Sequence, residues 1–212
     1  SVATTKAYSA QLAAMYCLAV QFARVREKIT EEQYSFYISE LLSIPEKMEK
    51  VLEDKERIQW FAAKYANAHD VFFVGRGIDY AISLEGSLKL KEISYIHCEA
   101  YAAGELKHGT ISLIEPGTPV IALATDPGLF EKTESNLREV RSRGAQVTLI
   151  CPEGVCVPEE SADEIVRLPE CSAPARLFAS LVAIQMIAYT TAAFRGCDID
   201  RPRNLAKSVT VE

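Results

Sequence analysis

The sequence lacks several patterns that would indicate a function class. No CxxC pair occurs among its 212 residues, and the three histidines share no ligand-like spacing with the cysteines, so we expect no metal and no cofactor. Acidic residues outnumber basic ones, which gives a net charge of −6. Because nucleic-acid affinity comes mainly from Lys and Arg displacing counterions, this charge argues against a nucleic-acid-binding protein. Internal repeats and low-complexity segments are also missing.

The cysteines and the first residues bear on the cellular compartment. The six cysteines are Cys17, Cys98, Cys151, Cys156, Cys171 and Cys197. Several have apolar neighbours, as reduced and buried thiols usually do. The opening SVATTKAYSAQL lacks the charged-then-apolar order of a secretory signal. We therefore expect a reducing, cytoplasmic location.

One long apolar run needs a separate interpretation. Leu177 to Phe194 contain no charged residue and are flanked by Arg176 and Arg195. A membrane span needs about 20 predominantly apolar residues, whereas this run is at the short end and includes Gln185 and several hydroxyl side chains. We expect a buried helix of a globular domain.

Residues 1–70 carry helical patterns only. From Thr4 to about Glu27 the spacing of Ala, Leu and Val predicts one long helix, without Gly or Pro. Two helical pieces are expected to follow, the second opened by Pro45, since proline is tolerated in the first turn of a helix. The tail at 196–212 contains no confident element, because Pro202 prevents the last helix from continuing.

The range 71–195 alternates short apolar runs with helical stretches. The strand candidates are residues 71–77, 119–125, 146–152 and 164–170. Continuous apolar strands separated by helices are typical of a parallel sheet covered on both faces. We therefore predict an α/β fold, a flavodoxin-like doubly wound parallel sheet preceded by long N-terminal helices. Ligands are expected beyond the C-terminal ends of its strands.

The segment LEGSLKLKEISYIHCEAYAAGELKH, residues 84–108, is predicted to be helical and carries an unusual charge pattern. On a projection of about 100° per residue, Glu85, Lys89 and Glu92 occupy an arc of about 60° between two apolar flanks. The side expected to face solvent holds Ser83, Ser87, Lys91 and Ser94.

Two interpretations of these charges remain open. In the first, Glu85 and Lys89 form an ordinary i,i+4 pair, and Glu92 adds an i,i+3 partner on a solvated surface. In the second, a carboxylate and an ammonium share a partly dry cleft, where desolvation and a close partner adjust the pKa of a general base.

The turn that precedes this helix is equally ambiguous. VGRGIDYAISLEG predicts a strand, a glycine turn and a helix start, an order that directs backbone N–H groups at an anion such as phosphate. A tight turn from strand to helix would need Gly75 and Gly77 in any case, so the pattern alone does not establish a phosphate site.

Two segments resemble a known family. VGRGIDYAISLEGSLKLKEISYIHCEAYAAGELKHG and DIDRPRNLAKSVTVE are similar to the isomerase region of the glutamine:fructose-6-phosphate aminotransferases (isomerizing), or glucosamine-6-phosphate synthases, and the likeness extends over essentially the whole chain. In that family, a glutaminase domain precedes two sugar-isomerase (SIS) subdomains. The resemblance implies a fragment with a linking helical segment at 1–70, the second SIS subdomain at 71–195 and an active-site tail at 196–212.

The resemblance also implies roles for individual residues. Glu92 matches the base that moves a proton between C1 and C2 of the open-chain sugar, and Lys89 matches the lysine beside it. His108 matches the histidine assigned to ring opening, which in the family serves the neighbouring subunit of a homodimer. Lys207 matches the lysine that forms a Schiff base with the keto sugar. Ala206 is implied to lie near the bound substrate and the route of ammonia.

The resemblance gives no catalytic role to several other positions. Thr110 stands where many relatives have proline, which puts the local loop shape in doubt. We expect His97 to pack near the helix end and Glu85 to serve as the helix pair of Lys89. Without the resemblance, His108 would be an ordinary helix-end residue and Lys207 a solvated lysine of a terminal tail.

The function implied is formation of glucosamine 6-phosphate from fructose 6-phosphate and glutamine-derived ammonia, with the glutaminase domain and the first SIS subdomain as partners in the full-length chain. As an isolated fragment, the chain is expected to be nearly inactive. Two alternatives stay open: a non-catalytic phosphosugar-binding or regulatory SIS module, and a purely structural dimerisation module.

Overall fold

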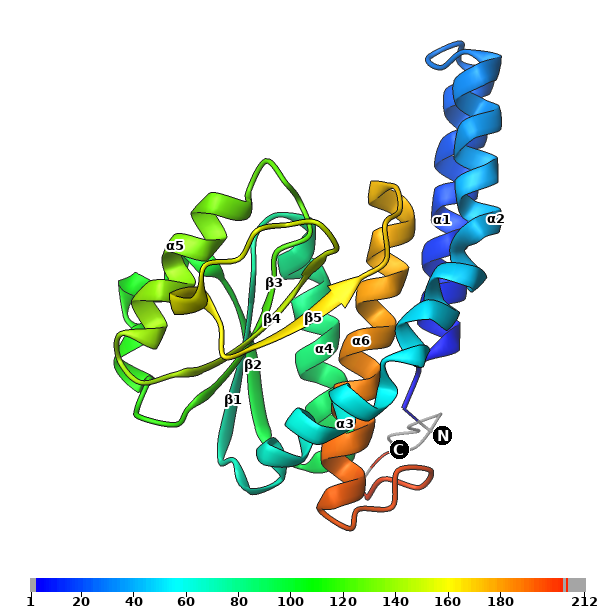
Figure 1. Ribbon diagram of the computed structural model, residues 1–212. Coiled ribbons are helices and arrows are strands. Elements are labelled where there is room, and N and C mark those ends of the chain that lie inside the picture. Colours follow the sequence, from blue (N-terminus) through cyan, green and yellow to red (C-terminus); the bar gives the residue numbers. More distant parts are fainter. Residues whose placement is uncertain (1–2, 204, 206–212) are drawn as a thin grey trace, which may run out of the picture.

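The computed structural model describes residues 3–203 and 205, and its centre is a five-stranded parallel sheet (Figure 1). The strands are β1 (Asp70–Gly75), β2 (His97–Ala102), β3 (Pro119–Leu123), β4 (Gln146–Pro152) and β5 (Glu164–Leu168). Their order is β2-β1-β3-β4-β5, and every neighbouring pair is parallel. This is the flavodoxin-like order, so the predicted fold class is confirmed.

Helices cover both faces of the sheet. The long helices are α1 (Lys6–Val25), α2 (Glu31–Glu53), α3 (Lys55–Ala62), α4 (Ile78–Ser94), α5 (Phe130–Arg141) and α6 (Ala173–Phe194). Short 3₁₀ turns are η1 (Ala63–Asn67), η2 (Ala103–His108), η3 (Thr110–Leu113) and η4 (Glu159–Ser161). Helices α3, α4 and α6 lie on one face and α5 on the other (Figure 1), each over its own apolar cluster.

Helices α1 and α2 form a hairpin beside α6 that extends past the sheet (Figure 1). At its turn, Thr30 and Gln33 form a reciprocal capping box. The predicted helix start at Pro45 is wrong, because α2 continues through Pro45 to Glu53. Ile44 packs in a small cluster with Phe178 of α6, and this tertiary contact keeps the chain helical on both sides of the proline.

Helix α6 is the apolar run of the sequence. Among the described residues, this helix alone is long and apolar enough to cross a membrane by length and composition. However, 72% of its most apolar window is buried in the fold. It contacts α2, α3 and α4 along its length. The expectation of a buried helix is confirmed.

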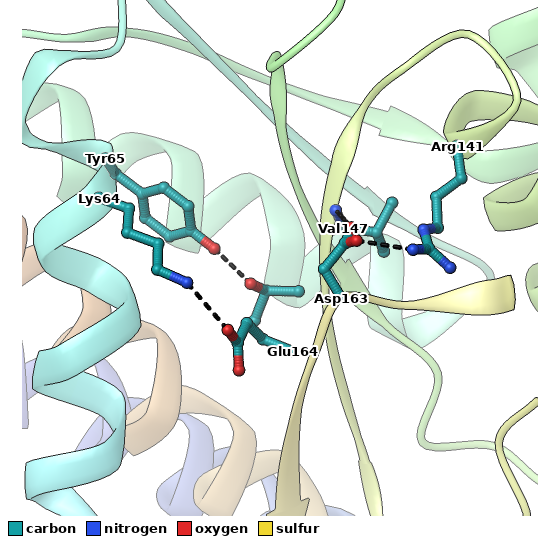
Figure 2. A network of polar contacts seen from close by, with 7 residues as sticks. Lys64, Tyr65, Arg141, Val147, Asp163 and Glu164 are labelled. Atoms are coloured by element: carbon teal, nitrogen blue, oxygen red, sulfur yellow. Dashed lines mark hydrogen bonds and ion pairs between the residues drawn. The ribbon is translucent and has the colours of Figure 1, made fainter. Parts of the chain in front are cut away.

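A polar network ties η1 to the sheet (Figure 2). The hydroxyl of Tyr65 pairs with that of Thr148 on β4, and Lys64 Nζ lies 3.1 Å from Glu164 Oε1 on β5. Next to them, Asp163 accepts hydrogen bonds from the side chain of Arg141 and from a backbone N–H of β4. Burial is the main cause of a raised pKa at Tyr65, which therefore stays a neutral donor or acceptor.

The long helix predicted over residues 84–108 ends earlier. Helix α4 stops at Ser94, Tyr95 adopts a left-handed conformation, and the chain then forms β2. His97 therefore begins an edge strand and is exposed, so its expected packing near a helix end is wrong. Its Nδ1 lies 2.6 Å from Asp70 Oδ1 on β1.

The expected solvent face of α4 is wrong for its three serines, although Lys91 on that face is exposed. Ser83, Ser87 and Ser94 are all buried, and each hydroxyl donates to a backbone carbonyl three or four residues earlier. A serine that bonds back to its own helix is satisfied internally and can lie in a closely packed contact. Leu84 and Leu88 are exposed instead, at 47% and 41%.

Candidate functional site

Three charged side chains of α4 form a buried cluster. Lys89 Nζ lies 2.6 Å from Glu92 Oε2 and 3.7 Å from Glu85 Oε1. The side chains of Lys89 and Glu85 are 5% and 9% exposed, whereas that of Glu92 is 19% exposed. The predicted i,i+4 and i,i+3 neighbours are confirmed, but the surface interpretation is wrong, because the ammonium has been removed from water.

The packing of α4 explains this burial. The helix packs on the sheet and beside α6, and Tyr8 of α1 comes close enough for the charge of Glu85 to raise the pKa of its phenol, after burial as the main cause. Burial also raises the pKa of Glu85; the Lys89 ammonium opposes this shift, and the Glu92 carboxylate adds to it. Oxygen Oε1 of Glu85 accepts no hydrogen bond from the described residues.

The cluster holds two carboxylates for one ammonium. Lys89 is hydrogen-bonded to Glu92, the more accessible of the two acids, while Glu85 provides a second negative charge behind it. In a low-dielectric setting, an ammonium within hydrogen-bonding distance favours the ionised form of a carboxylate. The arrangement suits a carboxylate that accepts a proton and returns it to a neighbouring atom.

His108 lies at the other end of the domain. Helix α4 starts after the C-terminal end of β1 and runs back, so Glu92 lies about 21 Å along the helix axis from Ile78, near the strands' N-terminal edge. His108 is exposed at the end of η2, which follows the C-terminal end of β2. Within one chain, the structure therefore does not bring His108 to Glu92.

The predicted tail residues Lys207 and Ala206 lie outside the described residues. The described part of the tail leaves α6 on the same side of the sheet as Glu92 and returns to the end of α4. There the backbone N–H of Arg203 donates to the hydroxyl of Tyr95 at 2.9 Å.

The crevice at the C-terminal edge was the place expected for a ligand. Between β1 and β3, where the strand order reverses, a cavity of about 330 Å³ is lined by Thr125, Asp126 and Arg176. The guanidinium of Arg176 donates to the backbone carbonyls of Thr125 and Cys171. Its Nη1 and Nη2 donors are therefore engaged within the protein, whereas its buried Nε has no hydrogen-bond partner among the described residues.

Asp79 is a residue that the sequence reasoning missed. It is 2% exposed in the first turn of α4, and it accepts the backbone N–H of Thr125 at 2.8 Å and the Thr125 hydroxyl at 2.6 Å. Burial raises its pKa despite these bonds. An acidic residue directly after the glycine turn was the available signal, because a carboxylate there competes with any bound anion.

The glycines are explained by the turn. A Cβ at position 75 would lie 2.5 Å from the backbone carbon of Asp79, and Gly77 has a φ of 55°. With Asp79 already at the helix start, the geometry favours a structural turn over a phosphate site. Among the described residues, no group of three or more His, Cys, Asp or Glu side chains is placed to hold a metal ion.

Comparison with known proteins now adds to this geometry. Residues 64–195, more than half of the chain, match the SIS domain family. The chain belongs to the SIS domain family. Its fold agrees with that assignment, since the match spans the sheet and the helices that cover it.

The sequence is similar along its whole length to two curated proteins called glutamine--fructose-6-phosphate aminotransferase [isomerizing]. Identity is 50% to the protein of Clostridium acetobutylicum and 51% to that of Clostridium tetani, each over 212 residues. The chain covers 35% of the length of each relative.

The fold is also similar to that of solved structures. The C-terminal domain of glucosamine-fructose-6-phosphate aminotransferase from Francisella tularensis superposes with a TM-score of 0.89 at 33% identity, over 95% of this chain and 57% of that one. A glucosamine-6-phosphate deaminase from Thermotoga maritima shares the fold, with a TM-score of 0.69 at 24% identity.

Proposed function

We propose that this chain is the catalytic C-terminal part of a glutamine:fructose-6-phosphate aminotransferase that makes glucosamine 6-phosphate from fructose 6-phosphate and ammonia. The observation that carries this proposal is the 2.6 Å contact between buried Lys89 and accessible Glu92. The similarity to aminotransferases over the full chain supports it.

In this proposal, Glu92 moves a proton between two carbon atoms. The amine of Lys207 attacks the C2 carbonyl of the open-chain keto sugar, and water leaves as the Schiff base forms. Ammonia then adds at C2, and the amine of Lys207 departs. Glu92 takes the proton from C1 as the C=N electrons move onto the nitrogen at C2, and it then delivers the proton to C2. The O1 hydroxyl proton passes to that nitrogen, so C1 becomes the aldehyde and C2 carries the amine. Ala206 adjoins Lys207 in the sequence and is assigned to the substrate-binding tail.

Lys89 has an electrostatic role in this scheme. Its ammonium donates a hydrogen bond to Glu92 at 2.6 Å and places a positive charge beside the carboxylate that accepts the proton. A second donor of the ammonium is available for the nitrogen at C2, which gains negative charge as the C1 proton leaves. Lys89 is thus assigned two contacts, one with the base Glu92 and one with the atom that becomes negative when the base removes the C1 proton.

His108 is assigned to a neighbouring subunit. It lies at the opposite edge of the sheet from Glu92, so ring opening by His108 at the same sugar requires a second copy of the chain. The proposal therefore includes a homodimer, with the glutaminase domain and the first SIS subdomain as further partners. A cytoplasmic location and a role in amino-sugar biosynthesis belong to the same proposal.

Borohydride trapping tests this function. In the full-length protein, fructose 6-phosphate followed by borohydride should leave a reduced sugar adduct on Lys207, which peptide mass spectrometry would identify. Lys207→Arg should leave none, whereas Lys132→Arg, an exposed change on α5, should trap normally. Sugar binding without any adduct would instead indicate a non-catalytic binding or regulatory module.

A further inference from the structure

Tyr95, directly after α4, has an unusual backbone conformation. Its φ is 63°, and its backbone N–H donates to the carbonyl of Lys91 at 3.2 Å, as in a helix C-cap. Glycine is the usual residue at such a position, because a side chain disfavours the left-handed region. A tyrosine here indicates that its side chain makes contacts that glycine would lose.

Those contacts are with the C-terminal tail. The Tyr95 hydroxyl accepts a hydrogen bond from the backbone N–H of Arg203 at 2.9 Å. The guanidinium of the same residue lies 4.1 Å from the centroid of the Tyr95 ring, a cation–π distance. One aromatic side chain therefore holds both the backbone and the side chain of Arg203.

The loop that leads to Arg203 is itself folded. Gly196 ends α6 with a φ of 70°, and Asp198 Oδ1 then accepts the backbone N–H groups of Asp200 and Arg201. Pro202 is buried. At the start of the loop, Cys197 Sγ lies 3.9 Å from the carbonyl of Ser94. The loop thus contacts the end of α4 at both its beginning and its end.

We propose that Tyr95 and Arg203 form an anchor that fixes the position of the C-terminal tail at Arg203. Tyr95 stands three residues after Glu92, and Arg203 stands four residues before Lys207. Tyr95 is a positioning residue, because it acts through the tail and touches neither sugar nor ammonia. The inference rests on the proposed function of Lys207. The anchor fastens a residue four positions before Lys207 to the C-cap of the helix that carries Glu92.

The substitutions Tyr95→Phe and Arg203→Ala separate the two contacts. Tyr95→Phe keeps the ring under the guanidinium but removes the hydroxyl that accepts the Arg203 N–H. Arg203→Ala keeps the backbone bond and removes the cation–π contact. Tyr189→Phe, on an exposed tyrosine of α6, is the matched control for loss of a hydroxyl.

Amide hydrogen exchange of this chain tests the anchor without any sugar. In Tyr95→Phe, exchange at the Arg203 amide should accelerate roughly fivefold, because one hydrogen bond is lost. Arg203→Ala should change the exchange of that amide only about twofold. Equal exchange in Tyr95→Phe and Tyr189→Phe would overturn the anchor.

Borohydride trapping in the full-length protein then tests the positioning role. The adduct on Lys207 at saturating fructose 6-phosphate should fall several-fold in Tyr95→Phe, while the melting temperature and the sugar concentration for half-maximal trapping stay unchanged. Faster exchange with normal trapping would leave the anchor but overturn its positioning role. If the unsubstituted protein forms no adduct, the role of Lys207 fails, and the positioning role fails with it.

Discussion

Helix α4 carries acidic side chains in two settings, and these are stabilised differently. Asp79, in the first turn, is held by two fixed donors of Thr125 and has both oxygens engaged. Further along the helix, Glu85 and Glu92 share one ammonium, one Glu85 oxygen accepts no hydrogen bond from the described residues, and Glu92 is partly accessible.

The difference separates a structural acid from a reactive one. A carboxylate that accepts two hydrogen bonds from Thr125 fastens the chain after β3 to α4, and at 2% exposure Asp79 is closed to a substrate. A carboxylate whose charge depends on a shared lysine, with part of its surface open, can exchange a proton with a substrate. This contrast is a firmer basis for assigning Glu92 than the spacing of charges along the helix.

Of the substitutions that test this comparison, Lys89→Met should change the free energy of unfolding most. The change leaves the buried Glu85 and the partly accessible Glu92 without their cation, which should cost about 3–5 kcal/mol of unfolding free energy near neutral pH. Urea unfolding at pH 7 measures it. As a matched control, Lys132→Met on exposed α5 should change stability by less than about 0.5 kcal/mol. A loss below about 1 kcal/mol for Lys89→Met would show that the cluster is solvated.

Asp79→Asn should have an intermediate effect. The amide keeps the shape of the side chain but offers one acceptor where the two Thr125 donors now find two, so we expect a loss of about 1–2 kcal/mol. Thermal and urea unfolding measure this loss. Asp79→Asn should leave the protonation of the Glu92 cluster unchanged; a shift in the pH dependence of activity would contradict the separation of the two acids.

Glu85→Gln should have the smallest effect, which should appear in how the free energy of unfolding depends on pH. Burial raises the pKa of Glu85 in the folded state, so the protonated form is favoured by folding. The destabilisation from ionised Glu85 is absent below its unfolded pKa of about 4.3 and is complete above the raised folded pKa.

Stability of the unsubstituted chain should therefore contain a component that falls as pH rises through this window, and Glu85→Gln should lack that component. Urea unfolding across the acidic range checks it, with exposed Glu131→Gln as the control. An unchanged pH profile in Glu85→Gln would exclude the raised pKa.

Much of the fold followed from residue patterns. The apolar runs VFFVG, PVIAL and QVTLICP became buried parallel strands, and the uncharged run at 177–194 became part of buried α6. Strand β2 was missed because HCEAYA is an edge strand, in which His97 and Glu99 face solvent and break the apolar run. Single-chain patterns cannot separate such a strand from the helix before it.

The site was only partly predictable for a related reason. Spacing placed Glu85, Lys89 and Glu92 on one face, but whether that face is dry depends on α1 and α6, which are distant in sequence. The serines of α4 were assigned to the wrong side, since a hydroxyl that bonds to its own helix can be buried. The roles of His108, Ala206 and Lys207 came from resemblance alone and remain predictions.

Glu92→Gln in the full-length protein tests the central claim most directly. Glucosamine 6-phosphate formation should fall at least about 100-fold, since a general base contributes that much or more, while the Lys207 adduct still forms and Glu131→Gln retains full activity. Formation of glucosamine 6-phosphate within about twofold of the unsubstituted rate would remove Glu92 from proton transfer and contradict the account.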